Sequence, residues 1–174
     1  MRKVTYGAAC SLDGYIASPD DGVDWLLWSN RVQALSAEYW GTIDTVVMGR
    51  RTYEAAVALG TPAWPGVRNV VFSRMLGRAA TAPVEVVAGD AAAFVKNLKS
   101  GPGRGICVMG GGRLARALFC AGLIDEVGVN LHPIMLGAGI PLLPGPLPAG
   151  GLELIRSALL EGGCVYLLYR VVQG

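Results

Sequence analysis

Residues 108–119, VMGGGRLARALF, place three consecutive glycines between a short apolar run and a segment with helical spacing. The run Ile106–Met109 is typical of a strand, and Leu114, Ala117 and Leu118 recur as on one face of a helix. Glycine loses more conformational freedom on folding than any other residue, so a glycine triplet indicates that the backbone comes close to something. That partner is either a neighbouring element of the fold or the phosphate of a bound ligand.

Strand-like and helix-like segments alternate along the chain on both sides of this turn. Ser29 and Asp90 are placed to cap two helices, and Gly101 and Gly122 to end two. Residues 11–28 are expected to form a loop, and the turn EGG joins the last two strands as a hairpin. The predicted strands are residues 4–10, 45–48, 69–72, 84–87, 106–109, 126–131, 152–159 and 164–172. The predicted helices are residues 29–40, 49–59, 90–101 and 114–122. This pattern indicates an α/β domain whose mostly parallel sheet ends in antiparallel strands.

Composition limits the class of protein. The chain has 174 residues, 52% of them hydrophobic and 16% charged, which fits one globular domain over residues 1–174. A net charge of +2 is too small to imply nucleic acid, and no apolar run is long enough for a bilayer span. The four cysteines form no C-x-x-C pair and the single histidine has no cysteine near it, so we expect no metal site. Reduced core cysteines and the absence of a signal-like start favour a cytoplasmic protein.

Three predicted strand exits share residues that suit phosphate. The sequence MGRRTYE (residues 48–54) follows one strand, VFSRM (71–75) another, and MGGGRL (109–114) a third. Ligands of such sheets bind where loops leave the carboxyl ends of the strands. Bare amides at a helix start and nearby arginines bind phosphate oxygens. Together the three exits predict a dinucleotide site, and arginines at its end favour the phosphorylated ribose of NADPH over NADH.

A standard Rossmann domain is the competing explanation for the glycines. Gly110, Gly112 and Ala115 match the form G-x-G-x-x-A. The motif lies late in the chain, however, and the strand after it ends in Val129-Asn130-Leu131, without an acidic residue for the ribose hydroxyls. The context therefore argues against a Rossmann domain.

Several motifs occur in the order found in the dihydrofolate-reductase-like superfamily. They are SLDGYIA (11–17), VMGRRTYE (47–54), VVFSR (70–74), GGGRL (110–114), LIDEVGVNLHPIMLGAGIPLL (123–143) and the closing hairpin. More closely, the whole chain resembles the reductase half of the bacterial bifunctional riboflavin-biosynthesis deaminase–reductase. The resemblance implies a three-layer fold with a central, mostly parallel sheet of about eight strands, helices on both faces, and NADPH extended across the strand ends.

The resemblance also implies roles for individual residues around NADPH. Gly49, Arg50, Arg51 and Thr52 would hold the pyrophosphate and the adenosine side, and Ser73 and Arg74 would meet the 2′-phosphate. Met109 would precede the pyrophosphate cradle of Gly110, Gly111, Gly112, Arg113 and Leu114, and Ala9, Ile16 and Ala17 would line the nicotinamide.

The substrate side carries fewer signals. Dihydrofolate reductases are expected to have an acidic residue on the first helix, where SNRVQALSAEYW offers only Glu38 as a carboxylate, and this argues against dihydrofolate. Asp13, Glu38 and Asn130 are the catalytic candidates, while Trp25 and Asn130 are candidates for binding substrate. The lone His132 is more often a structural residue at such a position.

The resemblance implies an NADPH-dependent reductase of a small nitrogen heterocycle, similar to 5-amino-6-(5-phosphoribosylamino)uracil reductase. The zinc deaminase motifs of the fused enzyme do not occur in the chain. The alternatives are a dihydrofolate reductase and a non-catalytic protein that binds a nucleotide or flavin. Residues 136–145 and the closing hairpin could pack against a second subunit, so we expect a homodimer.

Overall fold

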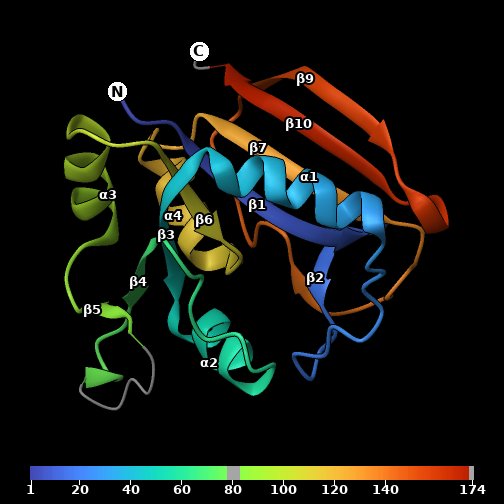
Figure 1. The fold of residues 1–174 in the computed structure, drawn as a ribbon, viewed down its shortest axis with the longest axis horizontal. Helices are drawn as coiled ribbons and strands as arrows, with labels where there is room; N and C mark the ends of the chain where they lie inside the picture. Colours follow the sequence, from blue (N-terminus) through green and yellow to red (C-terminus); the bar gives the residue numbers. More distant parts are fainter. Residues whose placement is uncertain (78–82, 173–174) are drawn as a thin grey trace.

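An eight-stranded sheet forms the centre of the computed structural model, which describes residues 1–77 and 83–172 (Figure 1). The strand order is β5-β4-β3-β6-β1-β7-β10-β9. From β5 to β7 each neighbouring pair is parallel, whereas β10 is antiparallel to both β7 and β9. The strands are β1 (Val4–Ser11), β3 (Ile43–Gly49), β4 (Arg68–Phe72), β5 (Glu85–Val87), β6 (Gly105–Met109), β7 (Glu126–His132), β9 (Gly151–Leu159) and β10 (Val165–Val172). The predicted sheet with its closing hairpin is confirmed.

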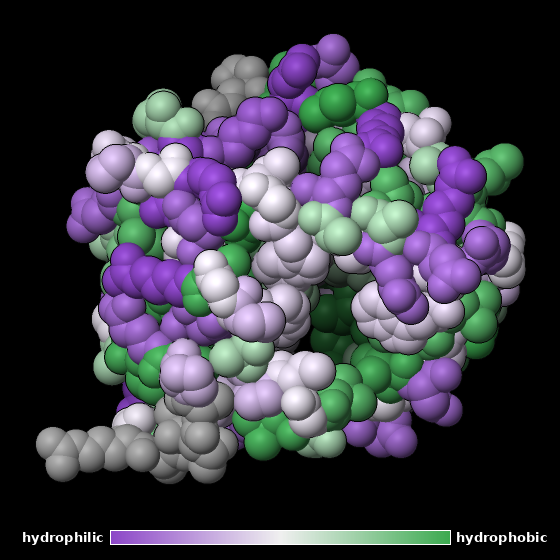
Figure 2. Space-filling model, viewed as in Figure 1, coloured by the Kyte–Doolittle hydropathy of each residue, from purple (hydrophilic) through white to green (hydrophobic). Residues whose placement is uncertain are grey.

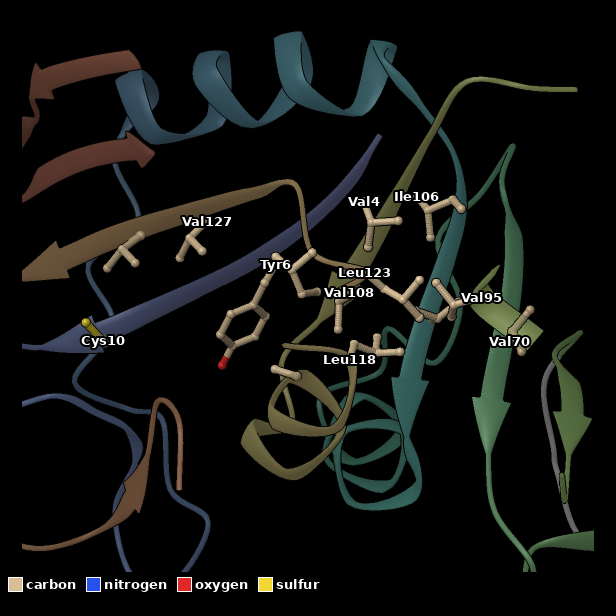
Figure 3. Close-up of a cluster of buried hydrophobic side chains, with 14 residues drawn as sticks. Val4, Tyr6, Cys10, Val70, Val95, Ile106, Val108, Leu118, Leu123 and Val127 are labelled. Carbon is tan, nitrogen blue, oxygen red and sulfur yellow. The ribbon is translucent and has the colours of Figure 1, made fainter. Parts of the chain in front are cut away.

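Helices cover both faces of this sheet, as predicted. They are α1 (Asn30–Gly41), α2 (Arg50–Ala58), α3 (Ala91–Ser100) and α4 (Gly112–Cys120). Side chains alternate between the two faces of a strand, so β6 sends Ile106 and Val108 to one face and Cys107 and Met109 to the other. Val95 of α3 and Leu118 of α4 pack against the first face, and Figure 3 shows both side chains in one cluster with Ile106 and Val108. The second face lies toward α1 and α2.

The local capping signals distinguish the four helices. The side chain of Ser29 accepts a hydrogen bond from the Val32 amide at the start of α1, and Asp90 accepts from Ala92 and Ala93 at the start of α3. The other two helices, α2 and α4, begin after Gly49 and Gly111, which offer no side-chain cap. These two uncapped starts both lie at strand exits that the sequence singles out.

The expected loop of residues 11–28 contains a short strand, which corrects the prediction. Strand β2 (Tyr15–Ala17) pairs antiparallel with β8 (Ile140–Pro141) in a separate two-stranded sheet. A three-residue strand carries too little sequence pattern to be recognised, and its partner lies far along the chain. The EGG turn is a short 3-10 segment, η2 (Glu161–Gly163), in which Gly162 adopts a φ of 72°.

The cysteines only partly follow the expectation of core residues. Cys10, Cys107 and Cys164 are buried free thiols, whereas Cys120 at the end of α4 is exposed. Within residues 1–77 and 83–172, no three or more His, Cys, Asp and Glu side chains are grouped so that they could hold a metal ion. No helix in the same residues has the length and apolarity required to cross a membrane.

Candidate functional site

The sheet order brings the predicted strand exits to one edge. Strands β4, β3, β6, β1 and β7 are consecutive neighbours and parallel, so their carboxyl ends lie side by side. The residues at these ends are Ser73 and Arg74 after β4, Gly49 to Thr52 between β3 and α2, Met109 to Leu114 between β6 and α4, Ala9 near the end of β1, and Asn130 near the end of β7. Residues separated by up to 121 positions in sequence therefore share one edge.

The first two glycines of the triplet form a left-handed turn. Gly110 and Gly111 have φ values of 53° and 74°, which side chains rarely adopt. A Cβ on Gly111 would lie 3.0 Å from Oγ1 of Thr52 and 3.9 Å from the amide nitrogen of Gly49. The turn after β6 is thus packed against the start of α2, and the two uncapped helix starts are neighbours.

The third glycine has a different physical role. A Cβ on Gly112 would lie 2.7 Å from the carbonyl oxygen of Pro141, 2.7 Å from Cδ of Pro144 and 2.9 Å from the carbonyl oxygen of Leu142. This position is glycine because the backbone of residues 141–144 passes directly over the start of α4. The third glycine of the triplet is therefore needed for close packing against a neighbouring segment of the fold.

The start of each uncapped helix carries positive electrostatic potential. The first backbone amides of a helix have no partner within it, and the helix dipole adds partial positive charge there. Arg50 and Arg51 open α2, where Arg50 lies 3.6 Å from Glu54 and 3.8 Å from the sulfur of Met75. Arg51 lies 4.0 Å from Asp21, at the limit of an ion pair.

The exit after β4 combines a structural hydroxyl with an exposed cation. Oγ of Ser73 accepts hydrogen bonds from the amides of Met75 (3.1 Å) and Leu76 (2.9 Å), which fixes the turn. Arg74 in that turn is exposed, as is Arg113 at the start of α4. The contact of Arg50 with Met75 links this exit to its neighbour. The edge therefore presents arginines from three separate exits.

A cleft of about 550 Å³ opens beside this edge, between the sheet and helices α1 and α2. Figure 2 shows a hollow with hydrophobic residues in its depth. The floor is formed by side chains of β1, β6 and β7, including Ala9, Met109 and Asn130, and Thr52 of α2 lines its side. An aromatic wall of the cleft, formed by Trp28, Trp40 and Trp64, was not predicted from the sequence. The large apolar surface of the indole side chain is the signal that could have suggested it.

Asn130 has an unsatisfied polar atom in the cleft. It pairs with Ala9 of β1 and Tyr166 of β10 in the sheet register. Its Oδ1 is buried and accepts no hydrogen bond from any residue that the structure describes. Buried polar atoms are normally paired, so this oxygen is a candidate ligand contact.

His132, next along the same face of β7, also lines the cleft and is 2% exposed. Its Nδ1 lies 3.4 Å from the amide of Leu27, which donates to it, and 3.4 Å from Sγ of Cys164. Burial lowers the pKa of His132, so the imidazole is neutral near pH 7. Trp25 packs edge-to-face on it, with ring centroids 5.3 Å apart. Trp25 itself is absent from the cleft wall, which its neighbours Leu26, Leu27 and Trp28 form instead.

The two candidate carboxylates lie outside the cleft, contrary to the expectation that they face a substrate there. Asp13 accepts from the Ser11 hydroxyl (2.6 Å) and from the amides of Gly137 (2.7 Å) and Leu136 (3.1 Å). The Ser11 hydroxyl is the main cause that lowers the pKa of Asp13, and the carboxylate ties the two loops together. Glu38 forms two hydrogen bonds with Arg156, at 2.9 and 3.3 Å, beside a separate cavity.

Two further predicted residues, Ile16 and Ala17, belong to β2. Ile16 packs against the main core, and Ala17 is buried with its carbonyl oxygen directly against Gly139, where a Cβ would not fit. Neither residue contributes to the wall of the cleft as the structure describes it.

The fold is an α/β domain with a candidate ligand site at the carboxyl ends of its parallel strands. The chain belongs to the RibD C-terminal domain family, whose model matches residues 2–166. The Bacillus subtilis (strain 168) protein YwjB is 34% identical over 144 residues, which cover 81% of this chain and 82% of YwjB. YyaP from the same organism is 24% identical over 181 residues, with 97% and 95% covered.

Solved structures show the same fold. A riboflavin biosynthesis-like protein from Shewanella sp. PV-4 superposes with a TM-score of 0.83 at 24% identity, covering 98% of this chain and 99% of that one. A pyrimidine reductase-like protein from Corynebacterium diphtheriae has a TM-score of 0.75 at 15% identity, with 99% and 93% covered. The Thermotoga maritima diaminohydroxyphosphoribosylaminopyrimidine deaminase/5-amino-6-(5-phosphoribosylamino)uracil reductase has a TM-score of 0.73 at 16% identity. This chain covers 56% of that bifunctional protein.

Proposed function

We propose that the protein is an NADPH-dependent reductase of a small nitrogen heterocycle. Its family and its reductase-like structural neighbours support the reaction class. The observation that carries the proposal is the packing of the Gly110–Gly111 turn against the start of α2, beside a cleft large enough for a drug-sized ligand.

The residues at the edge fit a nicotinamide dinucleotide. The left-handed turn at Gly110 and Gly111 carries no side chain of its own and lies between two uncapped helix starts, and such starts suit phosphate groups. Arg50 and Arg74 lie at the adjacent exits and suit the 2′-phosphate that distinguishes NADPH from NADH. Ala9, Thr52 and Met109 line the cleft next to this edge, where they would border the nicotinamide end.

The cleft suits a reduction in which the chain mainly binds and orients the substrate. When bound, the dinucleotide supplies a hydride. Asn130 would hold the acceptor through its buried Oδ1, and the aromatic walls would exclude bulk water. His132 is neutral and none of the described lining residues is a carboxylate, so the proton that the product requires would come from water.

The position of Glu38 disfavours the dihydrofolate reductase alternative. Its carboxylate is engaged by Arg156 and lies at a different cavity, so it cannot face a pterin in the cleft. A non-catalytic binder remains the second candidate, because the described cleft wall contains no carboxylate, lysine or arginine, and burial lowers the pKa of its histidine, His132.

Cofactor titration tests the proposed cofactor site. Quenching of the intrinsic tryptophan fluorescence should show tighter binding of NADPH than of NADH. Arg74→Ala should weaken NADPH binding by about 10-fold or more, because the variant loses charge-assisted hydrogen bonds to the 2′-phosphate. The same variant should leave NADH binding unchanged, because NADH has no 2′-phosphate. Arg170→Ala, in the closing hairpin, is the matched control and should leave both affinities unchanged. Equal binding of the two cofactors would contradict the assignment of this exit.

Turnover distinguishes the enzyme from the binder. NADPH consumption with a panel of nitrogen heterocycles, dihydrofolate included, should show a substrate other than dihydrofolate. Tight NADPH binding without consumption by any member of the panel would support the binder.

A further inference from the structure

The wall of the cleft lacks charge. Its polar members are threonine, serine, asparagine, histidine, cysteine and tyrosine, and no described residue that lines it is Asp, Glu, Lys or Arg. A phosphate placed there would lose its hydration without gaining a cation, which is unfavourable. The 5-amino-6-(5-phosphoribosylamino)uracil named for the Thermotoga enzyme carries such a phosphate.

The ionisable groups in the wall are held in their neutral forms. Burial raises the pKa of Tyr39 and Tyr166, raises the pKa of the Cys107 thiol to about 12, and lowers the pKa of His132. Near pH 7 the hydroxyls and the thiol therefore stay protonated and the imidazole stays uncharged. The described residues that line the cleft are therefore uncharged near pH 7.

Most cationic side chains of the cavity that adjoins the cleft are already in ion pairs. A second cavity of about 480 Å³ adjoins the cleft and shares Thr5, Leu35, Tyr39 and Tyr166 with it. Its cationic side chains are engaged: Lys3 with Glu126 (2.5 Å), Arg156 with Glu38 (2.9 Å), Arg2 with Asp44, and Arg104 with the carbonyl oxygen of Ile43 (3.0 Å). A phosphate at Arg2, Lys3 or Arg156 in this cavity would have to displace a carboxylate, whereas Arg104 donates to a backbone carbonyl.

The aromatic residues of the cleft wall and Asn130 favour a ligand with a planar aromatic ring. Trp40 and Trp64 are stacked, with centroids 5.7 Å apart and planes inclined by 22°, and Trp28 is a third indole in the wall. Flat aromatic surfaces favour stacked aromatic ligands. The buried Oδ1 of Asn130 lacks a donor among the described residues and would accept a hydrogen bond from a ring N–H or amino group.

We propose that the substrate of this reductase is an uncharged, planar aromatic heterocycle that carries an N–H or amino donor and no phosphate. The inference rests on the proposed function and narrows its substrate to a class different from the phosphorylated pyrimidine of the bifunctional enzyme.

Two matched pairs of probes test this inference. One pair is 5-amino-6-(ribosylamino)uracil and its 5′-phosphate, and the other is riboflavin and its 5′-phosphate. Each probe is titrated into the full chain saturated with NADP⁺, with the fluorescence of the cleft tryptophans as the readout. In each pair that binds, the unphosphorylated probe should bind at least about 10-fold more tightly than the phosphorylated probe, because binding of the phosphorylated probe buries an unpaired charge.

A designed cation should reverse the preference. Leu35 lies between the two cavities on α1, so Leu35→Arg should bring the phosphorylated probe to equal or tighter binding, whereas Leu35→Gln should keep the original order. Asn130→Leu should weaken binding of the unphosphorylated probe by about 10-fold, because the variant lacks the Oδ1 that accepts a hydrogen bond from the probe. The same variant should leave NADP⁺ affinity and the unfolding midpoint near the wild-type values, which a purely structural role would not predict.

The outcomes separate this inference from the proposed function. Equal or tighter binding of the phosphorylated probes by the wild-type protein, or no quenching by either unphosphorylated probe, would overturn the substrate class. The proposed function would still stand if NADPH bound with the expected preference and was consumed. Loss of that cofactor preference would instead overturn the proposed function.

Discussion

At the scale of single residues, the glycine triplet serves both the fold and the site. Gly110 and Gly111 supply left-handed backbone beside Thr52, whereas Gly112 allows residues 141–144 to cross the start of α4. The sequence alone leaves open whether a glycine is needed for a ligand or for a neighbouring segment. Only the distances to Pro141 and Pro144 assign the third glycine to the fold.

Gly112→Ala should therefore destabilise the protein. The added Cβ would meet two carbonyl oxygens and a proline ring at 2.7–2.9 Å, and overpacking of this kind costs about 1–3 kcal/mol. The measurement is the free energy of unfolding in urea. Gly41→Ala is the control, because Gly41 is exposed in α1 and its Cβ would contact nothing within 4 Å. An unchanged urea midpoint for Gly112→Ala would contradict this role.

At the scale of elements, some of the contacts that position the helices can be predicted from the local sequence and others cannot. The caps Ser29 and Asp90 were predictable because a capping side chain acts within three residues of its own position. The contact that attaches α3 to the sheet was not predictable from the local sequence. Nζ of Lys99 donates to Asp125 at 2.5 and 2.6 Å and to the carbonyl oxygen of Leu123 at 3.1 Å. The Lys99 side chain is only 10% exposed, and its partners lie 24 and 26 positions further along the chain.

Lys99→Met should loosen the attachment of α3. Asp125 would keep its bond from the Val4 amide but lose its cation, at a cost of about 2–3 kcal/mol. Urea unfolding measures the change. Arg170→Met is the matched control, because the Arg170–Glu153 pair is more than half exposed on both sides and should be worth less than about 1 kcal/mol. Equal losses for the two variants would show that the buried pair has no special role.

At the scale of the whole molecule, one long edge of the sheet has no pairing partner among residues 1–77 and 83–172. In this part of the chain strand β9 pairs with β10 alone, and Leu152, Leu154, Ile155 and Leu159 along it are exposed. An exposed edge strand with apolar side chains is a surface that proteins usually cover. This is the closing hairpin from which the sequence predicts a homodimer.

We expect the protein to be a homodimer that uses this hairpin. Multi-angle light scattering should give twice the mass of one chain, and Leu152→Lys with Leu154→Lys should give a single-chain mass, because two buried cations would be unpaired. Leu12→Lys, at an exposed leucine outside the hairpin, should leave the dimer intact. A wild-type protein with the mass of one chain would refute the expectation.

The sequence by itself determined the succession of the helices and of the strands of the main sheet, but not the short strands β2 and β8. It also determined the helix caps and the residues at the strand exits, because periodicity, capping and turn chemistry act over a few neighbouring positions. The tertiary structure alone decided which residues form the cleft. It placed Trp28, Trp40 and Trp64 there, and it directed Asp13 and Glu38 to other partners. Such contacts depend on the order and the faces of strands that lie far apart in the chain, and no local pattern specifies them.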